Sequence, residues 1–599
     1  MTEAYSKHKE RDPQATVDAI RGILGRVGLE TELSWGARSV KGLYSNYVTI
    51  EGTTLSACGK GTTEAYASAS GYAELMERIQ NGILVLYPPD GPDARTAHGY
   101  LAAPDERYTT AQRIVARHDQ ALEAWFDSLG IVTNADCIAL LKILPELRYD
   151  CGDGTVAEIP FADPVGGEVV WLPAALISYT CGSNGMAAGN TAEEALVQGF
   201  SEVLERFVAR KVLRGEVVPP RIPLRALANA GVADLIARVE RGGRLKVHVY
   251  DVSLGRGYPV VMTTVADRQR SALAVKFGAH PSLPIAIERT LTETFQYRSI
   301  QQATSMNRLT SAREAASLAN VTSVFTSGFG CFPRAPFAGK PEWDFAPWPS
   351  WEGASNKEML ASLLAVLARD GFRPLVRDVS HLGFPSFQIV VPGMSDVFAP
   401  DAGLYESLIA KRNAKKALDR FPQLSPEEQG HFLGLKPLDL ALSQPSMFGP
   451  PIQDGRMHPC RVFGFLHLAL RGYDEACECF EIFSSLTGEM GHRYWQAMAE
   501  YARCRNEGLV HKEALRIMRL LSLPDVVQLV EQETADATKD LSRLFPHINC
   551  PDCERCELLA RGGCAGLLGT HDAYGKIARS MRITTVSQEA LLALLQGMV

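Results

Sequence analysis

The chain has 599 residues, of which 46% are hydrophobic and 22% are charged, and its formal net charge is −7 at pH 7. This length predicts several domains with a large buried core. The negative charge argues against broad binding to nucleic acids or anionic membranes. The N-terminus has no apolar stretch of the signal-peptide type, and no run of about 18 apolar residues occurs anywhere. We therefore expect a cytoplasmic protein, in which the 13 cysteines form no disulfide framework.

The N-terminal part is predicted to contain both helices and strands. Apolar residues at helical spacing predict a helix over 14–28, and the β-rich run Tyr44–Ile50 predicts a strand. We expect a loop at Gly52–Gly61 and a later helix over Gln112–Leu129. The loop contains Lys60, but its glycine spacing does not match a Walker A motif. Lys60 is therefore a candidate for contact with a phosphate. The alternative is that Lys60 is an ordinary solvated lysine.

The stretch Ser183–Arg206 combines a small-residue loop with a helix that has an acidic face. Thr191 and Glu194 fit a capping box, which places the helix start at Asn190 or Thr191. One face of this helix carries polar side chains without an intervening base: Glu194, Gln198, Glu202 and Glu205. Such a face is typical of a site for a hard cation or a magnesium-bound polyphosphate. The alternative is an amphipathic surface helix with a capping glutamate.

The same pattern occurs earlier in the chain, which favours the functional interpretation. When Gly61 is aligned with Gly189, five further positions match: Thr63 with Thr191, Gly71 with Gly199, Glu74 with Glu202, Glu77 with Glu205, and Arg78 with Arg206. A weaker third version has Arg289, Glu293 and Gln296 on one helical face. Internal similarity of this kind indicates duplicated units that face a shared cleft.

The middle of the chain supplies most of the predicted strands. Runs of β-forming residues predict them at Val169–Leu172, Leu245–Val252, Tyr258–Val265, Ala272–Phe277, Leu375–Asp378 and Phe387–Val391. The second and third of these are expected to form a hairpin. Phe332–Gly353, rich in proline and tryptophan, is expected to be a loop over the surface or the cleft mouth. Strands mixed with long helices, without βαβ regularity, predict an α+β fold.

Four stretches together carry a resemblance to a known family: GKGTTEAYASASGYAELMER, SNGMAAGNTAEEALVQGFSEVLER, FGAHPSLPIAIERTLTETFQYR and VVPGMSDVFAP. In this order and at these separations they resemble the YcaO family, over residues 31–410. The resemblance implies a site where ATP and Mg²⁺ bind in a cleft lined by glutamates. It also implies an activity that phosphorylates a peptide amide oxygen and so activates that carbon for nucleophilic attack.

The resemblance, together with the acidic helices, assigns roles to individual residues. We expect Mg²⁺ ligands at Glu74, Glu77, Glu202 and Glu205. Catalytic roles are expected for Glu74, Glu202 and Arg289. Nucleotide contacts are expected from Lys60, Arg78, Ser183, Asn184, Glu194, Gln198, Arg206, Arg289 and Glu293. Each arginine has the alternative interpretation of a local ion pair with a neighbouring glutamate on its own helix.

The C-terminal part is predicted to contain helices and a metal-binding segment. Pro437–Pro459 has the composition of a linker. After it, Leu468, Gly472, Tyr473 and Ala476 resemble the first helix of a tetratricopeptide (TPR) unit, which predicts a partner-binding surface, with a helical cap or dimerisation element as the alternative. Four cysteines then follow at metal-ligand spacing: Cys550, Cys553, Cys556 and Cys564. Zinc and an iron–sulfur cluster both accept four thiolates, so the spacing does not choose between them.

The expected domain organisation is an N-terminal helix (1–30), a YcaO-type ATP-binding domain (31–410), a linker region (411–459), a TPR-like helical domain (460–535) and a Cys-rich C-terminal segment (536–599). A long form with such a helical extension is similar to proteobacterial members implicated in methylthiolation of an aspartate in a ribosomal protein.

Three functions remain open from the sequence. The favoured one is an ATP- and Mg²⁺-dependent accessory factor in methylthiolation, acting on a peptide or protein with a radical-SAM methylthiotransferase as partner. The second is modification of a ribosomally synthesised peptide, by azoline or thioamide formation. The absence of a Pro-x-Pro-x-Pro tail argues against the azoline-forming type. The third is a nucleotide-binding scaffold without catalysis, which the intact glutamates of both helices argue against. We expect a homodimer.

Overall fold

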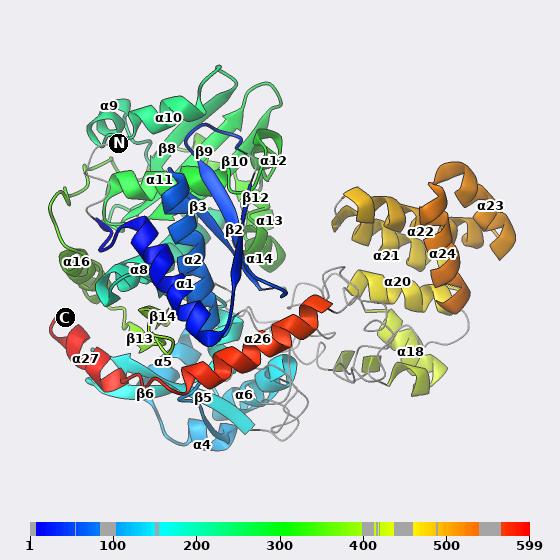
Figure 1. Cartoon of the computed structure of the whole chain (residues 1–599), viewed down its shortest axis with the longest axis horizontal. Helices are drawn as coiled ribbons and strands as arrows, with labels where there is room; N and C mark the ends of the chain where they lie inside the picture. Colours follow the sequence, from blue (N-terminus) through cyan, green and yellow to red (C-terminus); the bar gives the residue numbers. More distant parts are fainter. Residues whose placement is uncertain are drawn as a thin grey trace.

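The computed structural model describes residues 8–36, 38–53, 55–83, 103–149, 155–397, 413–414, 417–418, 420–435, 459–486, 489–537 and 565–598. A larger body of mixed helices and strands contains both ends of the described chain, and a group of helices lies beside it (Figure 1). None of the helices in these ranges is long and apolar enough to cross a membrane.

The described residues of the body form three sheets. The first is antiparallel in the order β1 (Thr31–Trp35), β2 (Tyr44–Ile50), β3 (Ser56–Gly61). The second has the order β12 (Gly330–Pro333), β11 (Asn307–Thr310), β10 (Ala272–Ala279), β9 (Val260–Asp267), β8 (Leu245–Asp251). The third has the order β4 (Arg107–Thr110), β5 (Thr155–Asp163), β13 (Leu375–Asp378), β14 (Ser386–Val390), β7 (Met186–Ala188), with β6 (Glu168–Pro173) paired to β5. Within the described residues only β11 and β12 pair in parallel, so the body is α+β as the sequence predicts.

Each sheet contributes one strand that leads directly into a long helix. β3 precedes α2 (Glu64–Gln80), β7 precedes α8 (Ala192–Leu213), and β10 precedes α11 (Leu283–Thr294). Each helix packs on the strand that precedes it. The first two helices begin in the same way, because the hydroxyls of their N-cap residues Thr63 and Thr191 each accept a backbone N–H from the first turn. The duplicated segments are therefore repeated strand–helix units.

The central helix α8 supplies much of the largest hydrophobic core. Phe200, Val203, Leu204 and Val208 are fully buried, which confirms that the side opposite the acidic face is the packed one. α16 (Asn356–Arg369) covers this side of α8.

Further helices complete the body. They are α1 (Pro13–Val27), α4 (Ala111–Val115), α5 (Gln120–Ser128), α6 (Asn134–Tyr149), α7 (Ala174–Thr180), α9 (Leu224–Asn229), α10 (Ala233–Val239), α12 (Ile300–Thr304), α13 (Ala312–Ala315), α14 (Leu318–Ser327) and α15 (Ala335–Ala338).

Three predicted elements differ from the structure. The expected loop at Phe332–Gly353 begins within β12 and contains the short helix α15. The expected loop at Gly52–Gly61 is wrong over its second half, because β3 pairs with β2 along Ser56–Gly61. The expected single helix Gln112–Leu129 is two helices, α4 and α5. The break between them contains His118 with a φ of 52°, followed by Asp119, whose carboxylate caps α5. The other strands and the hairpin of β8 and β9 are confirmed within a few residues.

The C-terminal helical region is present. It consists of a short 3₁₀ helix η2 (Phe421–Gln423), then α18 (Pro426–Leu433), α20 (Pro459–Ala469), α21 (Tyr473–Leu486), α22 (Glu489–Asn506), α23 (His511–Leu521) and α24 (Pro524–Ala537). Phe480 and Met498 lie fully buried in its own core. The similarity to TPR units stays a prediction. Most of the predicted linker and all four cysteines of the predicted metal segment lie outside the described residues.

The last two helices return to the body. Tyr574 and Ile577 of α26 (Ala565–Met581) are buried in one core with α1 and α2. Leu591 and Leu595 of α27 (Gln588–Gln596) are buried in the core built around α8. Gln588 also exchanges two hydrogen bonds with the backbone of Asp378 in β13, at 2.8 and 3.0 Å. Residues 565–598 therefore belong structurally with the body, and the expected separation of residues 536–599 does not hold for this part.

Candidate functional site

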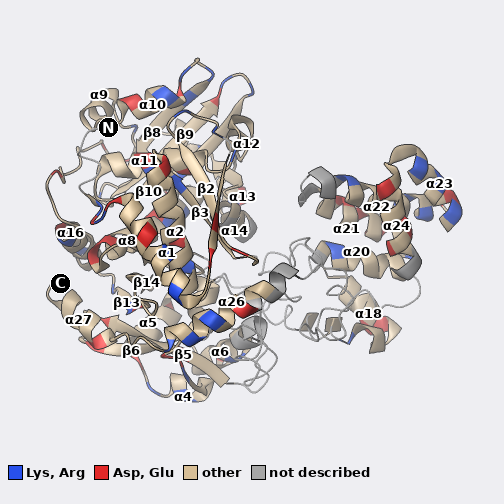
Figure 2. Cartoon of the chain, in the orientation of Figure 1, with Lys and Arg blue, Asp and Glu red and all other residues tan. Residues whose placement is uncertain are grey.

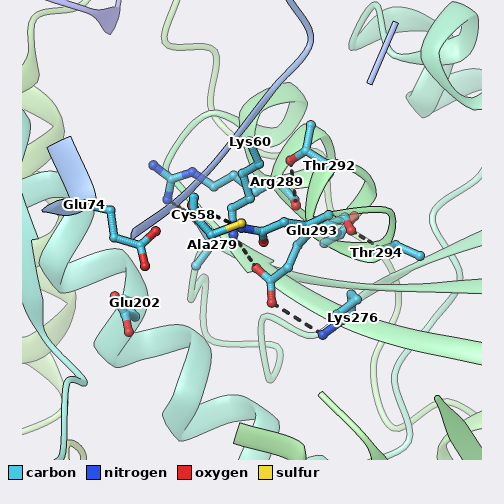
Figure 3. A network of polar contacts seen from close by, with 12 residues as sticks. Cys58, Lys60, Glu74, Glu202, Lys276, Ala279, Arg289, Thr292, Glu293 and Thr294 are labelled. Atoms are coloured by element: carbon cyan, nitrogen blue, oxygen red, sulfur yellow. Dashed lines mark hydrogen bonds and ion pairs between the residues drawn. The ribbon is translucent and has the colours of Figure 1, made fainter. Parts of the chain in front are cut away.

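The three strand–helix units bring three equivalent glutamates together. Glu74, Glu202 and Glu293 each lie eleven residues after the N-cap residue of their helix. Glu74 and Glu202 lie beside one another, and Glu293 lies near them on the third helix (Figure 3). With Glu77 and Glu205, one turn further along α2 and α8, they form what we call the acidic cluster. The weak third repeat is thus the equivalent of the other two.

Two lysines hold Glu293. Lys60 Nζ of β3 lies 2.8 Å from one carboxylate oxygen, and Lys276 Nζ of β10 lies 3.5 Å from the other. Burial alone would raise the pKa of Glu293, but these two ammonium groups, with Arg206, outweigh it and hold that pKa below its usual range. Burial lowers the pKa of Lys276 despite the attraction of Glu293. Glu293 is therefore the charged anchor of the cluster.

The arginines of the two E-x-x-E-R segments contact the glutamates of their own helices. Arg78 lies 3.5 Å from Glu74 and 3.5 Å from Glu77. Arg206 lies 3.9 Å from Glu202, and its guanidinium also donates to the carbonyl of Phe325 at 3.2 Å. These side chains keep 14–34% of their surface exposed, so the charges are accessible to a ligand. Both alternatives drawn from the sequence, local ion pair and ligand contact, are compatible with this arrangement.

Three carboxylates of the cluster have raised pKa values, although arginines contact two of them. Burial raises the pKa of Glu77 well above its ordinary value, and Glu202 and Glu74 add to that effect. Burial also raises the pKa of Glu202. It raises the pKa of Glu205 to about 7, with Glu293 as the second cause. Glu205 accepts no hydrogen bond from the described residues. A cation brought in by a ligand would therefore be stabilised here.

Arg289 and Gln198 tie the second and third helices together. The Arg289 guanidinium donates to the amide oxygen of Gln198 on α8 and to the carbonyl of Ala279 at 2.6 Å. Burial lowers the pKa of Arg289, while Glu205 and Glu202 oppose that shift. Arg289 thus lies in the electrostatic field of the cluster, and it contacts Gln198, which is another predicted site residue. Its role in the site stays a prediction.

Glu194 has a different environment from the other predicted acids. It lies two turns before Glu202 and is 5% exposed, and the N-terminal segment covers it. Its carboxylate accepts from Lys9 Nζ and from the Glu10 backbone, both at 2.9 Å. The expected capping box is therefore only half present. Thr191 caps the helix, but the Glu194 side chain bonds to the N-terminal segment instead of returning to Thr191. A role in nucleotide binding stays a prediction.

Two of the predicted nucleotide contacts, Ser183 and Asn184, lie in the small-residue loop and bond to nearby backbone. Asn184 is buried and its side-chain amide donates to the carbonyl of Ser395 at 3.0 Å. Ser183 accepts the backbone N–H of Met186. No contact within the described residues joins either side chain to the acidic cluster, so their role also stays a prediction.

One residue of the site is absent from the sequence-based set. Lys276 lies in the strand β10, which is otherwise apolar over Ala272–Ala279, and it is 10% exposed. A lysine within such a strand needs a buried partner, and this requirement could have identified Lys276 from the sequence as a candidate site residue.

The chain belongs to the YcaO family. Residues 58–395 match the family model described as YcaO cyclodehydratase, ATP- and Mg²⁺-binding. Over 406 residues the chain is 28% identical to the ribosomal protein S12 methylthiotransferase accessory factor YcaO of Escherichia coli strain K12, covering 66% of this chain and 67% of that protein. It is also 28% identical over 349 residues to an uncharacterized protein of Haemophilus influenzae, covering 58% of each.

Two solved structures are similar at lower levels. One is a heterocyclase in complex with substrate and cofactor, at 19% identity and a TM-score of 0.43, covering 65% of this chain and 53% of that one. The other is YcaO from Methanopyrus kandleri bound with AMPPCP and Mg²⁺, at 18% identity and a TM-score of 0.38, covering 67% and 96%.

Proposed function

We propose that this protein binds ATP with Mg²⁺ at the acidic cluster and uses it to phosphorylate the amide oxygen of a peptide. In this reaction ATP would supply the phosphoryl group, which turns the amide oxygen into a leaving group. A nucleophile then adds to the amide carbon, and phosphate departs with the former amide oxygen. ADP is the second product.

The observation that carries the proposal is the mixture of charges at the meeting point of α2, α8 and α11 (Figures 2 and 3). Magnesium triphosphate presents a cation and several anionic oxygens at once. The cluster offers partners for both, because carboxylates with raised pKa values lie beside Lys60, Arg78 and Arg206. No group of three or more possible ligands is gathered around one point in the described residues. Binding must therefore exchange some of the present ion pairs for contacts with the metal and the phosphates.

The individual roles follow from this exchange. We propose that Glu74, Glu77, Glu202 and Glu205 hold Mg²⁺ and that Lys60, Arg78, Arg206 and Arg289 neutralise phosphate oxygens. Such positioning and electrostatic stabilisation need no nucleophile from the protein.

For the acceptor, we favour an accessory role in methylthiolation of a ribosomal protein, with a radical-SAM methylthiotransferase as partner. The name of the E. coli relative supports this choice. Modification of a ribosomally synthesised peptide is the second candidate, supported by the cyclodehydratase description of the family.

Titration of the protein with Mg-ATP tests the site. Glu74→Gln and Glu202→Gln each remove a charge but keep the size and hydrogen-bonding capacity of the side chain. Each should weaken Mg-ATP binding by about 1–3 kcal/mol, the range for a lost charge-assisted contact. Glu193→Gln, on the same helix as Glu202 but about 100° from Glu194, is the matched control and should leave the affinity unchanged. Equal affinities for all three variants and the wild type would exclude a shared site, and the scaffold alternative would then stand.

A further inference from the structure

The strand β1 has an open edge. Within the described residues it pairs only with β2, in antiparallel register. The backbone N–H of Gly36 donates to Ser45, and hydrogen-bonded pairs in an antiparallel ladder recur at every second residue. The main-chain groups of Glu32 and Ser34 therefore point toward β2, and those of Leu33 and Trp35 point away from it. No hydrogen bond from the described residues reaches these outward groups.

Exposed apolar side chains lie on both faces of the sheet at this edge, together with the exposed Glu32 and Ser34 of β1. Leu33, Trp35 and Tyr47 expose 37%, 41% and 37% of their surface. Edge strands of soluble proteins are normally protected by charges, prolines or covering segments. An edge that combines free main-chain groups with exposed apolar side chains has the features of a docking surface for an extended chain.

Tyr297 adds an independent observation at the same place. It lies just after α11 and has a φ of 58°, a conformation that bulky residues rarely adopt. Its backbone N–H donates to Ser45 Oγ at 3.0 Å, its hydroxyl donates to the carbonyl of Ser34 at 3.1 Å, and its ring lies 4.0 Å from that of Tyr47. The strained backbone thus holds an aromatic pair against β1 and β2. Backbone strain of this kind is typical of functional positions.

The surface continues to the acidic cluster. Ser34, Tyr47 and Cys58 are direct neighbours across the three strands, so they share one face of the sheet. Lys60, two residues beyond Cys58, lies on the same face and contacts Glu293. Strands lie about 4.8 Å apart and an extended chain advances about 3.3 Å per residue. A peptide paired with β1 therefore needs only about four or five further residues to reach Lys60.

We propose that the edge of β1 and the Tyr47–Tyr297 face dock the acceptor as an extended peptide, added as a strand beside β1. The inference rests on the proposed function, in which the acceptor is a peptide. The occupant is defined by its chemistry. It donates and accepts main-chain hydrogen bonds at Leu33 and Trp35, and it carries apolar side chains at alternating positions.

The test uses the full-length protein and a displayed library of random twelve-residue peptides, selected in the presence of Mg-AMPPCP. The wild type should enrich sequences with apolar residues at every second position. The enriched peptide should bind Leu33→Pro about fivefold to tenfold more weakly, because proline removes an outward N–H without disturbing the pairing with β2. The matched control Leu33→Ala keeps that N–H and should lose less. A version of the peptide N-methylated at alternate residues should not bind the wild type.

Each other outcome overturns the proposal. Failure to enrich any peptide, or equal binding to wild type and Leu33→Pro, would remove the edge as a docking site. Conversion of a dimer to a monomer by Leu33→Pro, with peptide binding unchanged, would assign the edge to a second copy of the chain. Mg-ATP titration of the same variants separates the two proposals. In Leu33→Pro, nucleotide binding should be unchanged. A wild type that binds peptide but not nucleotide would retain the docking surface and reject the proposed enzyme, whereas a wild type that binds nucleotide but enriches no peptide would do the reverse.

Discussion

At the scale of single residues, the site depends on how much each carboxylate is compensated. Glu293 has two lysines and stays charged, whereas Glu205 is half-buried and accepts no hydrogen bond from the described residues, and burial raises its pKa from 4.5 to about 7. Between about pH 4.5 and 7, Glu205 is therefore protonated in the folded state but ionised in the unfolded chain. The contribution of Glu205 to stability falls as the pH rises through this window. A metal ligand must be ionised, so metal binding is expected to oppose that loss.

This argument predicts a pH dependence of Mg-ATP binding. If Glu205 must lose its proton to bind the metal, the affinity should rise about tenfold between pH 6 and pH 8. Glu205→Gln should bind more weakly at pH 8 and should lose most of this dependence. Without ligand, the same variant should be more stable than the wild type at pH 8 but not at pH 4, below both pKa values. Calorimetric titration and urea unfolding at the three pH values measure these effects. A wild-type affinity that is flat across pH 6–8 would contradict the assignment.

At the scale of elements, small residues let each helix approach its sheet. A Cβ on Gly71 of α2 would lie 2.7 Å from Asn46 Oδ1 and 2.8 Å from Val48 Cγ2, and a Cβ on Gly199 of α8 would lie 2.7 Å from Ile389 Cδ1. Both glycines come three residues before a glutamate of the cluster, so the close approach sets where Glu74 and Glu202 lie.

Gly71→Ala and Gly199→Ala should therefore each destabilise the protein by about 1–3 kcal/mol, the usual cost of overpacking. Mg-ATP binding should weaken as well, because the helix must shift. Gly25→Ala in α1 is the control. Its added Cβ meets nothing within 4 Å, and replacing a helical glycine should stabilise by about 0.5–1 kcal/mol. Urea unfolding and nucleotide titration of the three variants provide the comparison. If Gly199→Ala stabilised the protein as Gly25→Ala is expected to do, the close packing of the helix would not be what positions the glutamates.

The element scale also shows what the sequence could predict. The repeated Gly, Thr, Gly and Glu positions sufficed to predict two equivalent helices facing one site, because helix caps, close packing and charge each need particular residues at fixed spacing. β3 was missed because Ser-Ala-Cys-Gly-Lys-Gly has low strand propensity, and its strand is stabilised by pairing with β2 and by the helix packed on it. The ties of Lys276 to Glu293 and of Glu194 to Lys9 join residues far apart in the chain, which periodicity cannot reveal.

At the scale of the whole molecule, the chain leaves the body and then returns. The helices α20–α24 form a group with its own core, after which α26 and α27 complete the packing of the body. The division of the sequence at residue 536 missed this return, because a boundary was inferred from composition and the cysteine cluster. Binding of zinc or an iron–sulfur cluster by Cys550, Cys553, Cys556 and Cys564 stays a prediction. Cys564 immediately precedes α26 in the sequence, so this segment joins directly to a helix of the body.

The return of the chain leads to a prediction about the C-terminus. Removing residues 536–599 should destabilise the nucleotide-binding body, although every nucleotide-binding residue proposed here lies earlier. The reason is that buried side chains of α26 and α27 would be lost from two cores. Leu595→Ala tests the same point without truncation. Leu595 is fully buried in the core around α8, so this substitution should lower the free energy of unfolding by about 2–5 kcal/mol. Leu520→Ala is the control, because Leu520 on α23 is 85% exposed and should change stability by less than about 0.5 kcal/mol. Thermal unfolding with and without Mg-ATP measures both. A truncated protein that unfolds like the full chain and binds nucleotide equally well would show that the last two helices are dispensable to the body.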